Sequence, residues 1–246
     1  MSAAAAMLNV LKRKLGHIGP LSEEEQQVIA KTTSRVRTVA ARQDIVREGE
    51  EGLADCNLIL DGFAFRYKVL PGGRRQILSF QIAGDLCDIQ SFVLRRMDHS
   101  ISTLTPCRLA VIPHSTIRTI TESYPRIARA LWRETLVDAA VYREWMASIG
   151  RRSAYQRIAH LLCEVSTRLK AVGLGRDGSY ELPIIQADLA DALGLSIVHV
   201  NRTLQQLRAE GLITLRASTL FIHDRSRLEN AGGFDPSYLQ LKEGAS

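Results

Sequence analysis

Side chains that can read nucleic-acid bases are concentrated between residues 196 and 206. This segment carries Asn201, Arg202 and Gln205, and no acidic residue occurs from residue 195 to residue 209. An arginine guanidinium can donate two hydrogen bonds to guanine, and an asparagine or glutamine amide can pair with adenine in the same way. The segment therefore predicts contact with base edges in the major groove of double-stranded DNA.

The elements that would position these side chains are indicated by the pattern of residues 186–204. Counted from Gln186, apolar residues stand at positions four, eight, ten and fifteen, and Ala190 stands at position five, where two crossing helices would touch. Gly194 stands at position nine, where a short turn needs a positive φ. Ser196 can cap the second helix. The pattern is typical of a helix-turn-helix; an ordinary helical hairpin with a polar outer face is the alternative.

A β-hairpin is predicted after the second helix. Gly211 can end that helix, and the residues from 215 to 222 read as two short strands around Ala217-Ser218. Residues near the tip of such a wing could contact phosphates without reading sequence. The candidate DNA-binding residues are Gln186, Ser196, Ile197, Val198, His199, Asn201, Arg202, Gln205, Arg216, Ser218 and Thr219.

The first half of the chain has a different pattern of apolar and turn-forming residues. Residues 1–35 are predicted to be helical, with Leu8, Leu11 and Leu15 at helical spacing and a capping box from Ser22 to Glu25. Residues 36–113 alternate short β-prone runs with glycine-centred turns, as in a small antiparallel barrel or roll. Residues 116–169 return to a helical period, which is broken near residue 150.

In these segments the chain resembles the CRP/FNR superfamily of bacterial transcription regulators. The resemblance implies an α+β fold with an N-terminal antiparallel, jelly-roll-like β-roll of the cyclic-nucleotide-binding type, a long dimerisation helix and a C-terminal winged helix-turn-helix. The expected boundaries are 1–123 for the effector domain with its N-terminal helices, 124–150 for the helix and 151–246 for the DNA-binding domain. The residues that carry the resemblance are 45–50, 60–62, 73–78, 84–85, 193–196, 200–204, 207–208 and 211–213.

Two residues depart from the family pattern in the helix-turn-helix. Ile185 stands where family members have Thr or Ser before the first motif helix, so that a side-chain cap is lost at a cost of about 1 kcal/mol. Val198 stands where a base-reading Glu is common; it removes an acceptor for cytosine but can touch a thymine methyl. We therefore expect an operator that differs from the best-known family consensus, with Arg202 contributing most to base discrimination.

The ligand cassette of cyclic-nucleotide-binding relatives is not retained. Aligned without gaps from Gly84-Asp85, its Gly-Glu pair falls on Asp88-Ile89 and its Arg-Ser pair on His99-Ser100. A cyclised phosphate needs a cation and backbone N–H groups, whereas Asp88 would add negative charge. We therefore expect a small effector other than cyclic AMP, or none. The candidate effector-pocket residues are Leu78, Phe80, Asp88, Ile89, His99 and Ser100.

A homodimer is expected because one recognition helix reads few base pairs, whereas a two-fold dimer places two such helices about 34 Å apart, one turn of DNA. The candidate interface residues are Ile127, Leu131, Val137, Val141 and Trp145. Glu134 and Asp138 interrupt this seam. The expected partners are an operator in double-stranded DNA, a second copy of the chain, RNA polymerase and an unidentified small effector.

Composition excludes several classes of protein. The chain has 246 residues and a net charge of +6, but the excess is spread as +3, +1 and +2 over residues 1–124, 125–150 and 151–246. No run approaches the ~20 apolar residues of a membrane span, so a cytoplasmic protein is expected. The four cysteines form no C-x-x-C pair, which favours core thiols over a metal or cofactor site.

Two other kinds of protein remain as alternatives to a DNA-binding regulator. One is an effector sensor whose output is mainly protein–protein contact, with vestigial DNA binding. The other is an enzyme, but the sequence has no G-x-S-x-G, P-loop or H-E-x-x-H motif. We therefore predict a regulator without catalytic residues.

Overall fold

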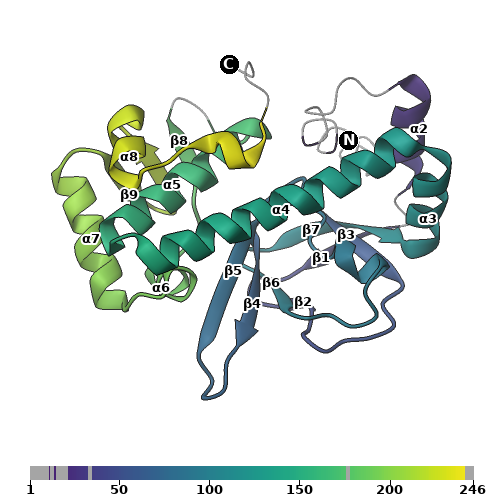
Figure 1. Cartoon of the computed structure of the whole chain (residues 1–246), viewed down its shortest axis with the longest axis horizontal. Helices are drawn as coiled ribbons and strands as arrows, with labels where there is room; N and C mark the ends of the chain where they lie inside the picture. Colours follow the sequence, from purple (N-terminus) through teal and green to yellow (C-terminus); the bar gives the residue numbers. More distant parts are fainter. Residues whose placement is uncertain (1–10, 12–13, 15–21, 33–34, 176–177, 242–246) are drawn as a thin grey trace. The chain divides into compact units, whose positions relative to one another are not determined.

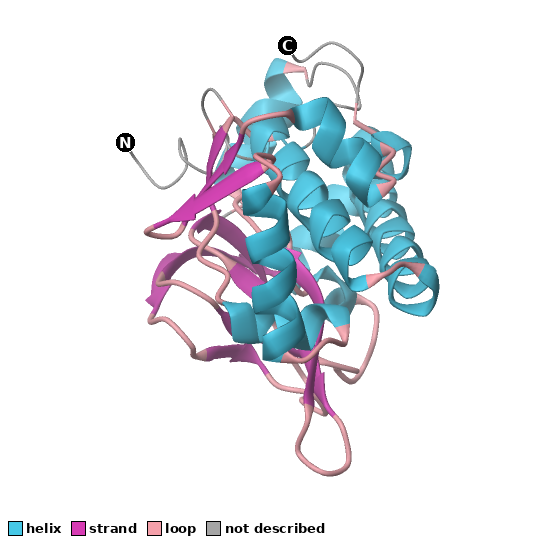
Figure 2. Ribbon diagram, turned by 90° about the vertical axis from the view of Figure 1, so that its left-hand side faces the viewer, coloured by secondary structure: helices cyan, strands magenta, loops and turns pink. Residues whose placement is uncertain are grey.

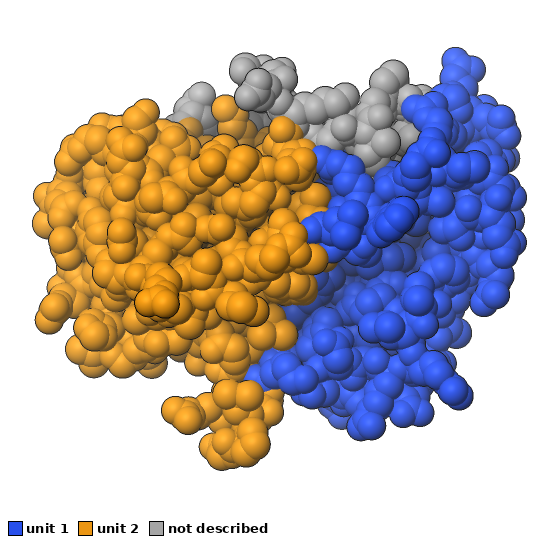
Figure 3. All heavy atoms as spheres, viewed as in Figure 1, with its two compact units in different colours: residues 1–68, 80–136 blue, residues 69–79, 137–246 orange. Residues whose placement is uncertain are grey.

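The computed structural model describes residues 11, 14, 22–32, 35–175 and 178–241 (Figure 1). Its contacts divide the chain into two compact units, Met1–Lys68 with Phe80–Leu136, and Val69–Ser79 with Val137–Ser246 (Figure 3). In this division the segment Val69–Ser79 groups with the C-terminal unit, where Arg75 pairs with Asp188 and Asp191. The expected domain boundaries stay a prediction. The division also falls inside a long helix, which belongs to both units.

The N-terminal half forms the predicted antiparallel roll, whose strands are drawn in magenta in Figure 2. One sheet has the order β1-β7-β3 and the other the order β2-β6-β4-β5. Register is fixed by pairs such as Arg35 with Val111 and Ala64 with Thr103. The strands are β1 (Arg35–Val39), β2 (Asp44–Val46), β3 (Asp55–Asp61), β4 (Ala64–Val69), β5 (Arg75–Gln81), β6 (Ser100–Thr103) and β7 (Cys107–Pro113).

The core of the roll is closed by apolar side chains from several of its strands. Ile59, Ile101 and Leu109 are fully buried in one cluster. The turn from β3 to β4 passes close to β7 at Gly62, whose φ is 93°. A Cβ at Gly62 would lie 2.4 Å from the carbonyl oxygen of Pro106, so only glycine fits this crossing.

Helices flank the roll along the chain. Helix α2 (Glu23–Lys31) begins with the predicted capping box: Ser22 N–H donates to the Glu25 carboxylate at 2.7 Å, and Glu25 N–H donates to Ser22 Oγ at 3.1 Å. The helix predicted through residue 35 ends at Lys31, and Leu8 and Leu15 lie outside the described residues. The other elements of this part are η2 (Ile89–Phe92), α3 (His114–Ser123) and the start of α4 (Pro125–Arg151).

The C-terminal part is a winged helix-turn-helix with additional elements. Its three-stranded sheet has the order β8-β10-β9, so β8 adds a strand that the glycine-rich segment before it did not predict. Helix α8 and turn η3 were also not predicted, because the sequence there is polar and weakly periodic. The elements are α5 (Ala154–Ala171), β8 (Ser179–Glu181), α6 (Gln186–Leu193), α7 (Ile197–Ala209), β9 (Ile213–Arg216), β10 (Thr219–Ile222), α8 (Arg225–Gly232) and η3 (Pro236–Leu239).

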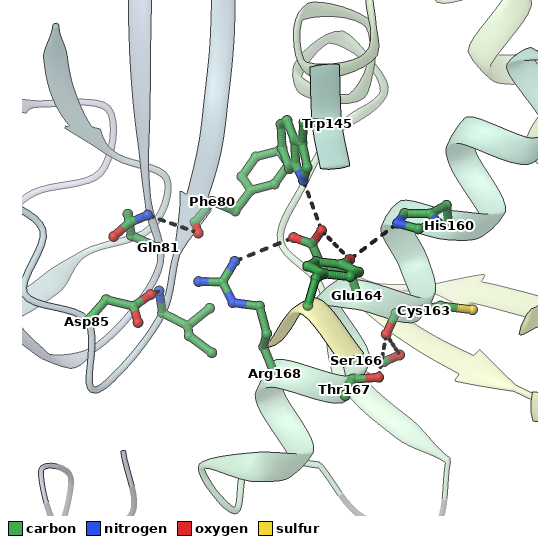
Figure 4. Close-up of polar contacts among 12 residues, drawn as sticks. Phe80, Gln81, Asp85, Trp145, His160, Cys163, Glu164, Ser166, Thr167 and Arg168 are labelled. Atoms are coloured by element: carbon green, nitrogen blue, oxygen red, sulfur yellow. Dashed lines mark hydrogen bonds and ion pairs between the residues drawn. The ribbon is translucent and has the colours of Figure 1, made fainter. Parts of the chain in front are cut away.

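A buried carboxylate joins three of these elements. Glu164 of α5 has no exposed surface, and it accepts hydrogen bonds from Trp145 Nε1 of α4 at 3.0 Å and from Tyr238 Oη of η3 at 2.8 Å. Figure 4 shows Trp145 and Arg168 pointing toward this carboxylate; the Arg168 guanidinium lies 3.7 Å away. Hydrogen bonds to a buried charge are stronger than those between neutral groups, so this cluster anchors the C-terminal turn.

Candidate nucleic-acid interface

The two helices of the motif meet as the sequence predicts. Gly194 takes a left-handed conformation with φ 63° directly after α6. Ser196 then caps α7, since its Oγ accepts a hydrogen bond from the His199 N–H at 3.2 Å. The side chains that α7 buries against the rest of the winged helix-turn-helix (the DNA-binding head) include Val200, Leu204 and Leu207. The inner face of α7 is thereby fixed and its other face is left toward solvent.

The outer face of α7 presents most of the predicted base-reading side chains. Val198 is 79% exposed and Ile197 is 54% exposed. His199, Arg202 and Gln205 are also exposed. Together with the absence of acidic residues along the helix, this face offers donors and apolar groups to a DNA groove.

Asn201 and Gln186 are brought together by the fold. Asn201 Nδ2 donates to Gln186 Oε1 at 3.2 Å, which links the start of α6 to the middle of α7. Asn201 is half-buried as a result. The Asn201 side chain is therefore held by Gln186 and still keeps part of its surface in solvent.

The N-terminus of α6 confirms the predicted loss of a side-chain cap at Ile185, which makes no side-chain cap hydrogen bond. The reciprocal bond of a capping box is present, since the Asp188 carboxylate in the first turn accepts the Ile185 N–H at 3.3 Å. Asp188 has no exposed surface. A buried carboxylate is costly unless it is paired, and the fold brings the Arg75 guanidinium to it at 3.0 Å.

The wing places its three candidate residues at one tip. Strands β9 and β10 pair with Arg216 opposite Thr219, and the connecting residues Ala217 and Ser218 have φ values of 43° and 62°. Two positive φ values in a two-residue loop define a type I′ turn, which normally uses Asn or Gly. The Ser218 carbonyl accepts a hydrogen bond from the Leu182 N–H at 2.7 Å, which holds the strained tip.

Sequence reasoning missed Arg75 at this interface. Its side chain pairs with two carboxylates of α6, although it lies more than a hundred residues earlier in the chain. The available signal was the pair of aspartates on a short helix of a DNA-binding head, which calls for a compensating cation. Pairing between distant residues is not visible in local spacing.

Two of the expected effector-pocket residues are fully buried. Asp88 and Phe80 have no exposed surface. The Asp88 carboxylate accepts hydrogen bonds from the backbone N–H and side-chain amide of Asn57 at 2.6 and 2.5 Å. Burial raises the pKa of Asp88 to about 6 despite these bonds. Asp88 and Phe80 therefore lie in the core of the roll, and their contact with an effector stays a prediction.

The remaining candidates in the roll have internal contacts or partial exposure. His99 donates to Asp98 from Nδ1 at 2.8 Å and accepts from Gln90 at 3.2 Å, and burial lowers the pKa of its imidazole. Ser100 Oγ accepts the Glu48 N–H at 2.8 Å. Leu78 and Ile89 are each half-buried in the unit that contains them. His99 and Ser100 thus make contacts within the roll, and their place in an effector pocket stays a prediction.

The described residues contain no group of three or more His, Cys, Asp or Glu side chains arranged to hold a metal ion. All four cysteines are buried and free. Burial raises the pKa of the Cys56 and Cys163 thiols to about 12 and that of Cys107 to about 11. Thiols of this kind are poor nucleophiles and poor metal ligands.

Two family models match the chain, one for each half of this architecture. Residues 36–124 match the cyclic nucleotide-binding domain and residues 156–231 match the Crp-like helix-turn-helix domain. A probable transcriptional activator of Rhizobium leguminosarum bv. viciae is 30% identical over 197 residues, which cover 80% of each chain. The chain belongs to the CRP/FNR family. It is a transcription regulator with a DNA-binding helix-turn-helix.

Other similar proteins agree with this CRP/FNR assignment. The nitrogen fixation regulation protein FixK of Bradyrhizobium diazoefficiens is 31% identical over 172 residues, or 70% of this chain and 71% of its own. The solved structure of FixK2 from Bradyrhizobium japonicum superposes with a TM-score of 0.73 at 25% identity, covering 80% of this chain and 96% of that one. The predicted fold class and family are thus confirmed.

The CRP/FNR regulator exposes a different face of α4 from the one predicted as its dimer seam. Ile127, Val141 and Trp145 are 3%, 5% and 7% exposed, because they pack inside the chain's own units. Leu131 and Val137 are half-buried. The apolar side chains that α4 leaves in solvent are Trp132, Leu136 and Met146, at 67%, 56% and 73% exposure.

None of the helices among the described residues is long and apolar enough to cross a membrane.

Proposed function

We propose that this CRP/FNR regulator binds a two-fold operator as a homodimer and reads bases with α7. The observation that carries the proposal is the outer face of α7, which is exposed, capped by Ser196 and free of acidic residues. Arg202 would pair with a guanine edge, and Val198 would contact a thymine methyl. Arg216, Ser218 and Thr219 at the wing tip would contact phosphates and set the register.

The operator is tested by selecting bound duplexes from a random-sequence library and measuring binding of the selected duplex by fluorescence anisotropy. Arg202→Ala is expected to weaken specific binding by about 1–3 kcal/mol and to relax base preference at one position of each half-site. Arg208→Ala is the matched control, since Arg208 is exposed in the last turn of the same helix. An unchanged preference after Arg202→Ala would refute base reading by this residue.

The proposed dimer uses the exposed face of α4. Residues 132, 136, 139, 143 and 146 follow one another at intervals of four, three, four and three, the spacing of a heptad seam. Trp132, Leu136 and Met146 supply the apolar positions, and a second copy of the chain would cover all of them at once. A two-fold seam along a helix also matches the symmetry of a palindromic operator.

We propose that this regulator responds to a small effector other than cyclic AMP, or to none; the bonds of Asp88 to Asn57 and of His99 to Asp98 and Gln90 support this proposal. We expect titration with cyclic AMP to leave operator affinity unchanged.

RNA polymerase is the remaining proposed partner. Transcription in vitro with purified RNA polymerase, operator DNA and the regulator tests it. The expected result is more or less transcript from the operator template when the regulator is present. We propose that the regulator acts in the cytoplasm, and we propose no catalytic reaction for it.

A further inference from the structure

Helix α6 lies beside the recognition helix α7, and its charged residues are all acidic. Its sequence, Gln186–Leu193, contains Asp188 and Asp191 and no basic residue. Asp188 is fully buried, and Asp191 keeps 33% of its side chain exposed. Two carboxylates beside the recognition helix would repel DNA phosphates and would strain a buried position unless a cation compensates them.

The compensating cation comes from the segment Val69–Ser79, far from the helix-turn-helix in sequence. Arg75 Nε donates to Asp191 Oδ2 at 2.8 Å, and a terminal guanidinium nitrogen of Arg75 donates to Asp188 Oδ1 at 3.0 Å. A planar guanidinium can serve both carboxylates at once, which an ammonium group does less well. The Arg75 side chain is 29% exposed, so these pairs are partly shielded from solvent.

The next residue contacts the other end of the same helix. Gln76 Nε2 donates to the carbonyl oxygen of Ala192 at 3.2 Å. Carbonyls in the last turn of a helix have no partner within the helix and need one from elsewhere. Adjacent residues of one strand therefore hold both the first and the last turn of α6.

Asp188 also makes a contact within the first turn of α6. The Ile185 side chain offers no acceptor for the first N–H groups of α6, but the reciprocal bond of a capping box is present, since the Asp188 carboxylate accepts the Ile185 N–H. Arg75 supplies the positive charge beside this buried carboxylate, so Asp188 joins the start of α6 to the distant arginine.

We propose that Arg75 is a positioning residue for operator binding, which holds α6, and through it α7, in the DNA-reading arrangement. Arg75 acts by neutralising Asp188 and Asp191 and does not contact DNA. The winged helix-turn-helix is then incomplete without the segment Val69–Ser79. This inference rests on the proposed reading of DNA by α7.

The test compares full-length variants on the selected operator duplex across a range of salt concentrations. Arg75→Ala is expected to lower specific affinity at least tenfold. The slope of log affinity against log salt should change in magnitude by less than about 0.5. Loss of a phosphate contact would reduce the magnitude of this slope by about 1. Arg74→Ala is the matched control, because it removes the same charge from the neighbouring, exposed position, and it should stay within about twofold of wild type.

Rescue separates positioning from a general loss of stability. Adding Asp188→Asn and Asp191→Asn to Arg75→Ala removes the uncompensated charges, and Asn can still accept the Ile185 N–H. Operator affinity should return to within about threefold of wild type. Adding Ile185→Thr to Arg75→Ala should recover part of the affinity by supplying the missing cap.

Three results would overturn the proposal: equal affinities for Arg75→Ala and Arg74→Ala, a salt slope reduced by one in Arg75→Ala, or no rescue by the aspartate substitutions. Arg202→Ala is measured in the same series. If Arg202→Ala fails to weaken specific binding, the proposed reading by α7 is wrong. If Arg202→Ala weakens it and Arg75→Ala does not, only the positioning role is wrong.

Discussion

Replacement of Leu136 by Ala tests the proposed dimer seam on α4. Leu136 is 56% exposed in the single chain, so a second copy could bury about half of its side chain. Full burial of a leucine contributes about 1.5–3 kcal/mol, which leaves about 1–1.5 kcal/mol per protomer at this position. Both protomers of the variant lose this contribution, so Leu136→Ala is expected to weaken the dimer by about 2–3 kcal/mol. This corresponds to a roughly 30- to 150-fold increase in the dissociation constant.

Sedimentation equilibrium over a wide concentration range measures this constant directly. Leu174→Ala is the matched control, because Leu174 is 41% exposed but lies outside α4; it should leave the dimer unchanged. Val141→Ala is a second control, since Val141 is buried within the chain and its loss should lower the free energy of unfolding. If Val141→Ala weakens the dimer and Leu136→Ala does not, the seam lies on the face originally predicted.

Further predictions concern the stability of the winged-helix unit. Ile185→Thr should raise the free energy of unfolding by about 1 kcal/mol by capping α6, and chemical denaturation should show no such gain for the exposed control Val93→Thr. Gly232→Ala should lower it by about 1–3 kcal/mol, because the new Cβ would lie 2.6 Å from the backbone nitrogen of His160; Gly150→Ala, which meets no atom within 4 Å, should be neutral or stabilising. Burial lowers the pKa of His160 to about 4, so the unfolded chain takes up a proton first as pH falls. Stability should therefore decrease from about pH 6.5 to pH 4 by at most about 1.4 kcal/mol per pH unit, and His160→Gln should remove this part of the slope; parallel curves for the two proteins would contradict the assignment.

The acidic groups of the same protein change stability in the opposite sense. Burial raises the pKa of Glu164 and of Asp88, so their folded forms bind protons more readily than their unfolded forms as pH falls. Their contribution grows on acidification while that of His160 is lost. For this reason the difference between wild type and His160→Gln is the informative quantity, rather than either pH curve alone.

The helix-turn-helix and its cap were determined by local sequence. Gly194 and Ser196 fix the turn and the start of α7 through their own backbone and side chain, and the capping box at Ser22 works in the same way. Apolar spacing then gives the inner face of α7. Because these interactions join residues at most a few positions apart, composition and spacing were sufficient to predict them.

Tertiary contacts decided the features that spacing could not show. Helix α8 forms where the sequence is weakly periodic, and its Arg225 donates to Ser166 and Thr167 of α5, almost sixty residues earlier. The face of α4 that carries Ile127 and Trp145 is mostly apolar in sequence, but these two side chains are buried within the chain, whereas Leu136 is left in solvent.

Arg75 shows the same limit at the DNA-binding head. The sequence of α6 contains the carboxylates, whereas the cation reaches them only after the chain has folded. The local pattern thus determined that this protein has a DNA-reading helix. Only the tertiary structure decided which distant groups support that helix and which apolar face remains for a partner, because burial and ion pairing depend on residues that are neighbours in space.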